Sequence, residues 1–192
     1  MKIGLFGGSF DPVHHGHLML ARDAVEEAGL DEIRLMPAAR NPLKGEDAVS
    51  SGHHRMAMLE MAVEEEPGLI ADDWEVNRPP PSYTIETLRN MRERFPEAEL
   101  YLVIGADNLA VFHAWKANEE ILQLAQLLVF GRTEAGQLPD LPHQRLGRRI
   151  DLSSTEIRRR VAMGKSIRYL VPPPVSAYVA AHHLYRFEPI LP

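Results

Sequence analysis

Residues 3–17 read IGLFGGSFDPVHHGH, and this stretch decides most of what the sequence predicts about the fold. The apolar run at 3–6 is typical of a buried strand, and Gly7 and Gly8 predict a tight loop directly after it. Apolar residues at 18–28 then recur at helical spacing, and Gly29 is placed to end that helix. The segment therefore predicts a strand, a glycine loop and a helix in succession.

The same alternation continues along the chain. We expect further strands at 33–36, 69–76, 100–104 and 127–130, with 150–152 a candidate for a last one. We expect helices from about Ser51 to Pro67, at 84–95, at 107–124 as one bent helix or two short ones, at 154–163 and at 174–185. The segment 133–147 has turn residues and no period, which predicts a surface excursion.

Strands that alternate with helices predict an α/β protein with right-handed crossovers. We expect a Rossmann-like parallel sheet covered by helices on both faces, with a small C-terminal helical portion, in a single domain over residues 1–192. Ligands bind beyond the carboxyl ends of the strands in such sheets. The residues at those ends are Gly7-Gly8, Gly105-Ala106-Asp107 and Leu152-Ser153.

The composition excludes several classes of protein. The 21 Lys and Arg against 27 Asp and Glu give a net charge of −6, which is the wrong sign for holding long nucleic acid. There is no cysteine, which excludes disulfides, thiolate zinc sites and a cysteine nucleophile. The sequence shows neither a signal peptide nor an apolar run of membrane-spanning length, so we expect no membrane association and a cytoplasmic location.

The residues from Gly7 to His17 are the first candidate site. Two adjacent glycines allow the backbone to approach a bulky anion, and His14 and His17 lie three apart on the opening turn of a helix. The alternative is a glycine turn with solvent-exposed histidines. Three competing motifs are excluded. The glycines do not form the G-x-G-x-x-G of a dinucleotide-binding loop, and the H-E-x-x-H of a zinc hydrolase is absent. A P-loop ending in Gly164-Lys165-Ser166 would need glycine at position 159, where this chain has arginine.

The string GGSFDPVHHGH resembles the G-x-F-D-P-x-H-x-G-H signature of the nucleotidyltransferase superfamily. Over nearly its whole length the chain also resembles the bacterial nicotinate-mononucleotide adenylyltransferase family. This resemblance implies that His14 and His17 contact the phosphates of ATP. It further implies that the nucleotide is lined by Gly7, Gly8, Ser9 and Phe10.

The second candidate site is LSSTEIR at 152–158, where hydroxyls precede a helix that carries an arginine. The alternative is purely structural, because Ser153 and Glu156 have the spacing of a capping box. The segment resembles the family's I-S-S-T-x-I-R motif, with Leu152 in place of isoleucine. The resemblance implies that ATP is held by Ser153, Ser154, Thr155 and Arg158, and that Gly105 and Asp107, in a G-A-D segment, meet the adenosine.

The third candidate site follows three prolines, where Ser82-Tyr83-Thr84 opens a helix whose free N–H groups could receive a carboxylate. The alternative is an ordinary helix start. Similarity to the family's S-Y-T-x-x-T-L motif implies a site for the nicotinate carboxylate, with Trp115 stacked on the pyridine ring. The family commonly has P-H-K where this chain has Pro42-Leu43-Lys44, and Asn41 and Lys44 remain for a phosphate.

The resemblance implies transfer of adenylyl from ATP to nicotinate mononucleotide, giving deamido-NAD and pyrophosphate. Catalysis would rest on positioning and electrostatics from His14, His17, Lys44 and Arg158. Mg²⁺ would be held mainly by ATP phosphates and water, so we name no protein metal ligand.

Other functions remain open at this point: a related enzyme using nicotinamide mononucleotide or phosphopantetheine, and a non-catalytic nucleotide sensor. The SYT and GAD segments argue against phosphopantetheine, and the glycine spacing argues against an NAD-dependent oxidoreductase. The sequence does not fix an oligomeric state.

Overall fold

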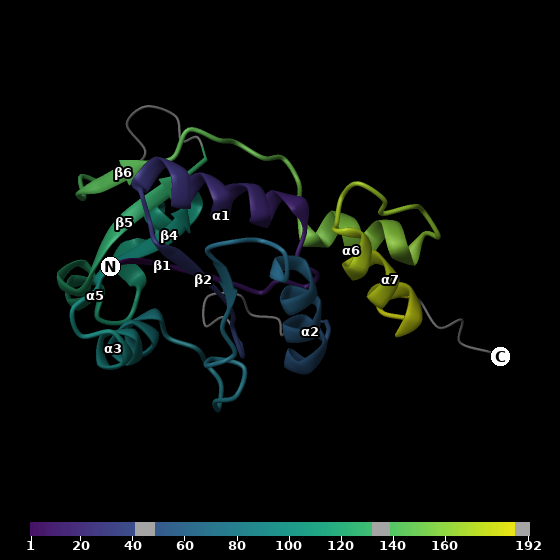
Figure 1. The fold of residues 1–192 in the computed structure, drawn as a ribbon, viewed down its shortest axis with the longest axis horizontal. Coiled ribbons are helices and arrows are strands. Elements are labelled where there is room, and N and C mark those ends of the chain that lie inside the picture. The colour runs from purple at the N-terminus through teal and green to yellow at the C-terminus, as the bar shows by residue number, and fades with distance from the viewer. Residues whose placement is uncertain (41–48, 132–138, 187–192) are drawn as a thin grey trace.

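The computed structural model describes residues 1–40, 49–131 and 139–186, and a parallel sheet forms its centre (Figure 1). The strands of the described part are β1 (Lys2–Gly8), β2 (Glu32–Pro37), β3 (Leu69–Ala71), β4 (Glu99–Gly105), β5 (Ala125–Phe130) and β6 (His143–Arg145). Their order is β3-β2-β1-β4-β5-β6, and each neighbouring pair is parallel. The order reverses between β1 and β4, which is where ligands bind in sheets of this type.

Helices cover both faces of the sheet, as the sequence predicts. Helices α1 (His15–Ala28) and α2 (Gly52–Val63) contribute to the hydrophobic core on one face, and α3 (Thr84–Arg94), α4 (Ala106–Ala110) and α5 (Asn118–Leu124) contribute to the core on the other. Helices α6 (Ser154–Ala162) and α7 (Pro173–Ala181) form the small C-terminal portion, and α7 contacts α2 (Figure 1). The predicted Rossmann-like α/β fold is confirmed.

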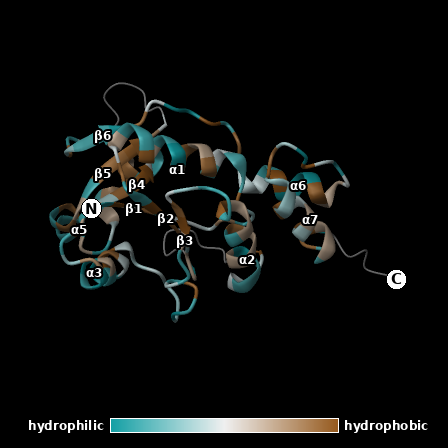
Figure 2. Ribbon diagram, in the orientation of Figure 1, coloured by the Kyte–Doolittle hydropathy of each residue, from teal (hydrophilic) through white to brown (hydrophobic). Residues whose placement is uncertain are grey.

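Strand β4 shows how the two cores are separated. Leu100, Leu102 and Ile104 join the core beneath α3 and α5, whereas Tyr101 and Val103 point to the opposite face and join the core beneath α1. Side chains alternate between the faces of a strand, so a run that is apolar throughout fills both cores. Figure 2 shows the resulting concentration of hydrophobic residues in the central strands.

The strand expected at 69–76 is wrong in its length, because β3 ends at Ala71. Asp72 is buried, and its carboxylate accepts a hydrogen bond from the Trp74 N–H and forms ion pairs with Arg34 and Arg94. A side chain that bonds the backbone two residues later makes a turn, and this turn stops the strand.

The last strand is also misplaced by the sequence pattern. Residues 150–152 form no strand, whereas β6 pairs with β5 inside the segment expected to be a surface excursion. Ile150 and Leu152 instead pack against the core under α1, and Ser153, the next residue, is the N-cap of α6. Residues 133–138 of that excursion lie outside the described part.

The segment expected as one bent helix or two short ones contains two short helices, α4 and α5, with a 3-10 turn at Phe112–Ala114 between them, as the second alternative predicts. Another helical boundary differs from expectation. The last helix ends at Ala181 rather than near Tyr185, since His183 and Tyr185 adopt positive φ angles of 52° and 62°. In the described ranges, no helix combines the length and apolar character needed to cross a membrane.

Candidate active site

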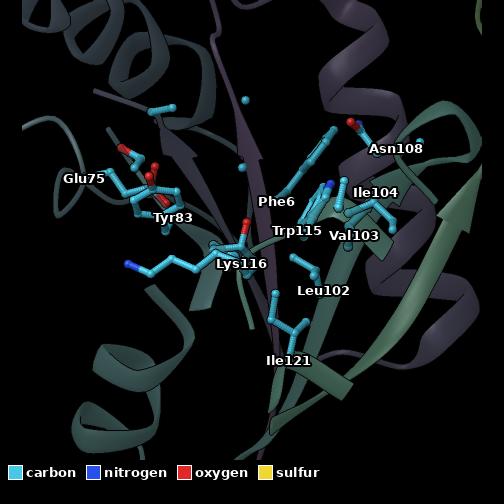
Figure 3. A pocket seen from close by; sticks show the side chains of 18 of the residues that line it. Phe6, Glu75, Tyr83, Leu102, Val103, Ile104, Asn108, Trp115, Lys116 and Ile121 are labelled. Atoms are coloured by element: carbon cyan, nitrogen blue, oxygen red, sulfur yellow. The ribbon is translucent and has the colours of Figure 1, made fainter. Parts of the chain in front are cut away.

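Two pockets adjoin at the carboxyl ends of β1 and β4. The first, which we call the histidine pocket, has a volume of about 730 Å³ and is lined by the loop after β1, the start of α1, Asp107 and the start of α6. The second, which we call the tryptophan pocket, has a volume of about 270 Å³ and is lined by the start of α3, Trp115 and apolar residues of β1 and β4 (Figure 3). The residues common to both linings are Phe6, Gly7, Gly8, Asn108 and Phe130.

His14 and His17 cap the N-terminus of α1 for each other. The His17 backbone N–H donates to Nδ1 of His14, and the His14 backbone N–H donates to Nδ1 of His17, both at 3.3 Å. The two rings stack with their centroids 3.6 Å apart. Both Nδ1 atoms act as acceptors here, so a ring proton in this arrangement resides on Nε2. The pair therefore offers two Nε2–H donors from the positive end of a helix.

Burial keeps the first of these rings uncharged. His14 is 5% exposed, and the loss of hydration lowers its pKa from 6.5 to about 4. Near neutral pH His14 is consequently a neutral hydrogen-bond donor. It can stabilise developing negative charge by donation, without carrying a positive charge of its own.

Gly16 is required because the His14 ring lies against its backbone. A Cβ atom at this position would lie 2.9 Å from Nδ1 of His14 and 3.0 Å from Cγ2 of Ile150. Both separations are shorter than ordinary van der Waals contact, so any larger residue would displace the ring. This explains the glycine within H-x-G-H in physical terms.

Phe10 supports the second histidine from the loop after β1. Its backbone is in the left-handed region at φ 48°, where a large side chain is strained, and its ring is 1% exposed. The ring packs edge-on against His17, with centroids 4.8 Å apart. The strained loop thereby holds both the glycine backbone and the His17 ring in place.

Arg158 approaches the same pocket from α6. Its Nη1 donates to the backbone oxygen of Asp11 at 2.8 Å, and its Nη2 donates to the Thr155 hydroxyl at 3.2 Å. The Ser154 hydroxyl donates to the backbone oxygen of Pro12 at 2.9 Å. Ser153 caps α6 by accepting from the Glu156 N–H, so the capping interpretation also holds for that residue. Capping and ligand binding are compatible here, because α6 itself points its N-terminus at the pocket.

A network of hydrogen bonds around Asp11 is not predicted by the sequence motifs. This residue is 1% exposed, and its carboxylate accepts hydrogen bonds from the Val49 and Ser50 N–H groups and from the Tyr185 hydroxyl at 2.7 Å. Ser50 also donates its hydroxyl to Tyr185. The signature thus connects the loop after β1 to the chain before α2 and to the C-terminal portion.

A second missed residue, Arg55, joins the loops after β1 and β2. Arg55 is 2% exposed, and Nη1 donates to the backbone oxygens of Ser9 at 3.0 Å and Ala38 at 2.7 Å. Burial lowers its pKa, and the nearby Asp11 carboxylate opposes that shift. The guanidinium therefore fixes the loop after β1 relative to the loop after β2, beneath the histidine pocket.

In the tryptophan pocket, the start of α3 provides donors without a side-chain cap. Tyr83 precedes the helix, and no side chain of the described residues accepts from the first turn. The first N–H groups of a helix have no acceptor within it, so those near Tyr83 and Thr84 are available to an anion. The Ser82 hydroxyl is used elsewhere, since it accepts from the Ala39 N–H at 3.0 Å.

Trp115 lies in the same pocket and shares its lining with Phe6 and Val103 (Figure 3). Its indole packs on Phe112 with centroids 5.3 Å apart, and its Nε1 is buried with no hydrogen-bond partner in the described part of the chain. Buried donors are nearly always paired in folded proteins, so this N–H is a candidate for pairing with a ligand atom.

Two charged residues that the sequence analysis did not single out also line the tryptophan pocket. Lys116 lies with its ammonium 4.0 Å from the Tyr83 ring centroid and pairs with Glu86 at 2.8 Å. Glu75 is 6% exposed and accepts a hydrogen bond from the Thr87 hydroxyl at 2.6 Å. No sequence pattern indicates either position, because both follow irregular segments.

The structure brings together most of the predicted site residues. All but one of the residues predicted to bind ATP line the histidine pocket: Gly7, Gly8, Ser9, Phe10, His14, His17, Asp107, Ser153, Ser154, Thr155 and Arg158. The exception is Gly105, which lines the tryptophan pocket. The tryptophan pocket contains Ser82, Tyr83, Thr84 and Trp115. Asn41 and Lys44 lie outside the described residues.

The chain is similar to a family model and to relatives that share one description. Residues 5–160 match a family model described as cytidylyltransferase-like. A protein of Opitutus terrae is 44% identical over 97% of this chain and 98% of its own length, and one of Rhodopirellula baltica is 40% identical over 96% of this chain and 93% of its own. Both are described as probable nicotinate-nucleotide adenylyltransferases.

A solved structure shares the fold. The nicotinic acid mononucleotide adenylyltransferase of Plasmodium falciparum, complexed with NaAD, matches with a TM-score of 0.77 and 19% sequence identity. The match covers 97% of this chain and 98% of that one.

Proposed function

This chain belongs to the cytidylyltransferase-like family and, within it, to the nicotinate-nucleotide adenylyltransferases, and from that premise we propose how its two pockets divide the reaction. The reaction transfers the adenylyl group of ATP to nicotinate mononucleotide, and its products are deamido-NAD and pyrophosphate. The enzyme acts in NAD biosynthesis. We assign ATP to the histidine pocket and the pyridine ring of the acceptor to the tryptophan pocket.

One observation carries this assignment: the two pockets share a wall at Gly7 and Gly8. The histidine pocket offers imidazole donors, an arginine and a helix N-terminus, which suit a polyphosphate. The tryptophan pocket is small and largely apolar, which suits a flat ring. A phosphate attached to that ring would meet the ATP phosphates beside the two glycines, where the backbone allows close approach.

The chemistry needs no covalent enzyme intermediate. A phosphate oxygen of nicotinate mononucleotide attacks the α-phosphorus of ATP, a new P–O bond forms, and the bond to pyrophosphate breaks with its electron pair leaving on pyrophosphate. The Nε2–H groups of His14 and His17 and the guanidinium of Arg158 would donate to the oxygens on which charge accumulates. We keep Asn41 and Lys44 as further donors to the acceptor phosphate or to pyrophosphate.

Mg²⁺ is proposed as the cofactor, held mainly by ATP oxygens and water. Among the described residues no group of three or more His, Asp or Glu side chains is arranged to hold a metal ion, so the phosphates would supply most of the ligands. When bound, the ion contributes positive charge next to the phosphates. We also propose that the enzyme works in the cytoplasm, where ATP is available.

The acceptor's carboxylate would bind the N–H groups at the start of α3. A carboxylate accepts hydrogen bonds and is attracted to the positive end of a helix, whereas a carboxamide brings its own donors toward the same N–H groups. Lys116 also lines this side of the pocket, where its charge is paired with Glu86. The ring would stack with Trp115, whose unpaired N–H is available to an acceptor atom.

The test is pyrophosphate release with ATP, Mg²⁺ and a panel of acceptors that contains nicotinate mononucleotide, nicotinamide mononucleotide and phosphopantetheine. We expect release with nicotinate mononucleotide and loss on the order of 10²–10³-fold in His17→Ala, as for removal of one oxyanion donor. His15→Ala is the matched control, because His15 is on the same turn but does not line the histidine pocket. Faster release with phosphopantetheine, or full activity in folded His17→Ala, would contradict the assignment.

A further inference from the structure

The tryptophan pocket contains a buried acid that the reaction scheme does not use. Glu75 lies in the segment between β3 and α3 and shares the pocket lining with Tyr83, Thr84 and Trp115 (Figure 3). It is 6% exposed. A carboxyl group in this place needs an explanation, because the same pocket is where the acceptor's own carboxylate is expected.

Two hydroxyl groups hold the Glu75 carboxyl against the start of α3. The Thr87 hydroxyl, on the second turn of that helix, donates to Oε1 of Glu75 at 2.6 Å. The Ser82 hydroxyl also hydrogen-bonds to Glu75 from the residue before Tyr83. The carboxyl is therefore held against α3, in the same pocket lining as Tyr83 and Thr84.

No cation neutralises Glu75 within the described part of the chain. Lys116, which lines the same pocket, pairs with Glu86, and Arg34 and Arg94 pair with Asp72. Burial is the main cause that raises the pKa of Glu75; the two hydroxyl hydrogen bonds oppose the shift, and the Asp72 carboxylate adds to it. Its neutral form is therefore more accessible than that of an exposed glutamate.

An acceptor carboxylate would add a second negative charge to this small pocket. Two carboxylates that share a site with little water do not both stay ionised, and the pKa of one of them rises strongly. The acceptor's carboxylate has the N–H groups of α3 to stabilise its charge. Among the residues that the structure describes, Glu75 has only hydroxyl donors, so it is the group that becomes neutral.

We propose that Glu75 takes up one proton from solvent when the carboxylate of nicotinate mononucleotide enters the tryptophan pocket, and that its charge state thereby sets the preference for a carboxylate over a carboxamide acceptor. This inference rests on the proposed function of the pocket. Glu75 acts as a specificity-determining residue, and nothing is transferred except the proton, which ends on the carboxyl oxygen of Glu75.

The sign of the pH dependence follows directly. At low pH Glu75 is already protonated, and the preference for nicotinate mononucleotide is high and constant. As pH rises through the pKa of Glu75 in the free enzyme, binding of this acceptor requires proton uptake, and its advantage falls by about tenfold per pH unit. The fall ends where Glu75 ionises in the complex as well.

The ratio of kcat/KM for the nicotinate and nicotinamide acceptors isolates this effect, because the phosphates, ATP and the histidines are common to both reactions. We would measure it from about pH 5 to pH 9 in the wild-type enzyme, Glu75→Gln, Thr87→Val and Asp73→Asn. Asp73 is the matched control, since it is an exposed acid of the same segment that does not line the pocket.

We expect the ratio to fall with rising pH in the wild-type enzyme and in Asp73→Asn. In Glu75→Gln it should stay flat and exceed the wild-type ratio at least about tenfold at the highest pH. Thr87→Val removes a hydroxyl that stabilises the ionised acid, so the fall should begin at a higher pH. Should Glu75→Gln not fold, the Thr87→Val displacement and the calorimetry below decide the question.

Calorimetry of nicotinate mononucleotide binding, in two buffers with different ionisation heats, reads the proton directly in the wild-type enzyme. At a pH above the pKa of Glu75 in the free enzyme, we expect the uptake to approach one proton per bound nicotinate mononucleotide. We expect no uptake when nicotinamide mononucleotide binds. A wild-type ratio that is flat with pH, a fall that persists in Glu75→Gln, or binding without proton uptake would each overturn the inference. Failure of the proposed function gives a different result, namely no turnover of nicotinate mononucleotide at any pH.

Discussion

Gly16→Ala is a substitution whose effect on activity should greatly exceed its effect on stability. The new Cβ would lie 2.9 Å from Nδ1 and 3.0 Å from Cε1 of His14, and 3.0 Å from Cγ2 of Ile150. Relief of these contacts requires the imidazole of His14 and the Ile150 side chain to move by a few tenths of an ångström. The movement also weakens the hydrogen bond from the His17 N–H to Nδ1 of His14.

The expected magnitudes differ for the two properties. Gly16 is in the first turn of α1, where the helical preference for alanine over glycine is at most about 1 kcal/mol, and this gain offsets part of the steric cost, so the free energy of unfolding should change by no more than about 1 kcal/mol. A misplacement approaching 1 Å at a catalytic group costs up to about 10²-fold in rate. We therefore expect turnover to fall by about 10- to 100-fold.

The assay is steady-state pyrophosphate release together with denaturant unfolding of the same preparation. Gly147→Ala is a suitable control, because the nearest atom to its added Cβ is Oε1 of Glu27 at 3.9 Å, remote from the histidine pocket. Turnover of Gly16→Ala within about twofold of the wild-type enzyme, with a normal fold, would refute the claim that this glycine exists to seat the His14 ring.

Three further predictions concern the histidine pocket and its support. Arg158→Ala should lower kcat/KM for ATP at least about tenfold in initial-rate assays, because a charged donor to phosphate is worth roughly 1.5–3 kcal/mol; unchanged kinetics would leave α6 with only its structural role. Tyr185→Phe should cost roughly 1–3 kcal/mol in urea unfolding, since the Asp11 carboxylate loses its hydroxyl donor, and no change would exclude a stabilising role for that contact. The depressed pKa of His14 means that the unfolded chain binds a proton between pH 6.5 and about 4 that the folded enzyme does not. Stability should therefore fall by up to about 3 kcal/mol as pH drops across this window, and His14→Asn, which retains an N-cap acceptor, should remove that part of the pH dependence.

The order of elements could be predicted because it depends on local patterns. Apolar runs that end at glycine identify β1 and β4, and helical spacing identifies α1 and α3. Strand β6 was missed since it is a three-residue edge strand with two exposed residues, and such a strand has no apolar alternation to detect. The strand expected at 150–152 is wrong because apolar residues alone do not make a strand: Ile150 and Leu152 pack on the core without hydrogen-bonding to the sheet.

The site could be predicted wherever a motif carries it, but the supporting residues could not. Arg55 and Glu75 look like ordinary surface charges in the sequence, and both are buried. Their partners are distant in the chain: Arg55 donates to the backbone of Ser9 and Ala38, and Glu75 accepts from Thr87. Contacts of this kind depend on how the segments meet in three dimensions, and no local periodicity records that.

The central claim is that the start of α3 and Trp115 form a site for an acceptor with a carboxylate. It is tested most directly by kcat/KM for nicotinate and nicotinamide mononucleotide at one pH near neutrality, with saturating ATP and Mg²⁺. Charge-assisted hydrogen bonds are about twice as strong as neutral ones, and an unpaired buried donor costs roughly 1–3 kcal/mol, so nicotinate mononucleotide should be preferred at least about tenfold. Equal values, or a preference for the nicotinamide form, would contradict this assignment of the tryptophan pocket.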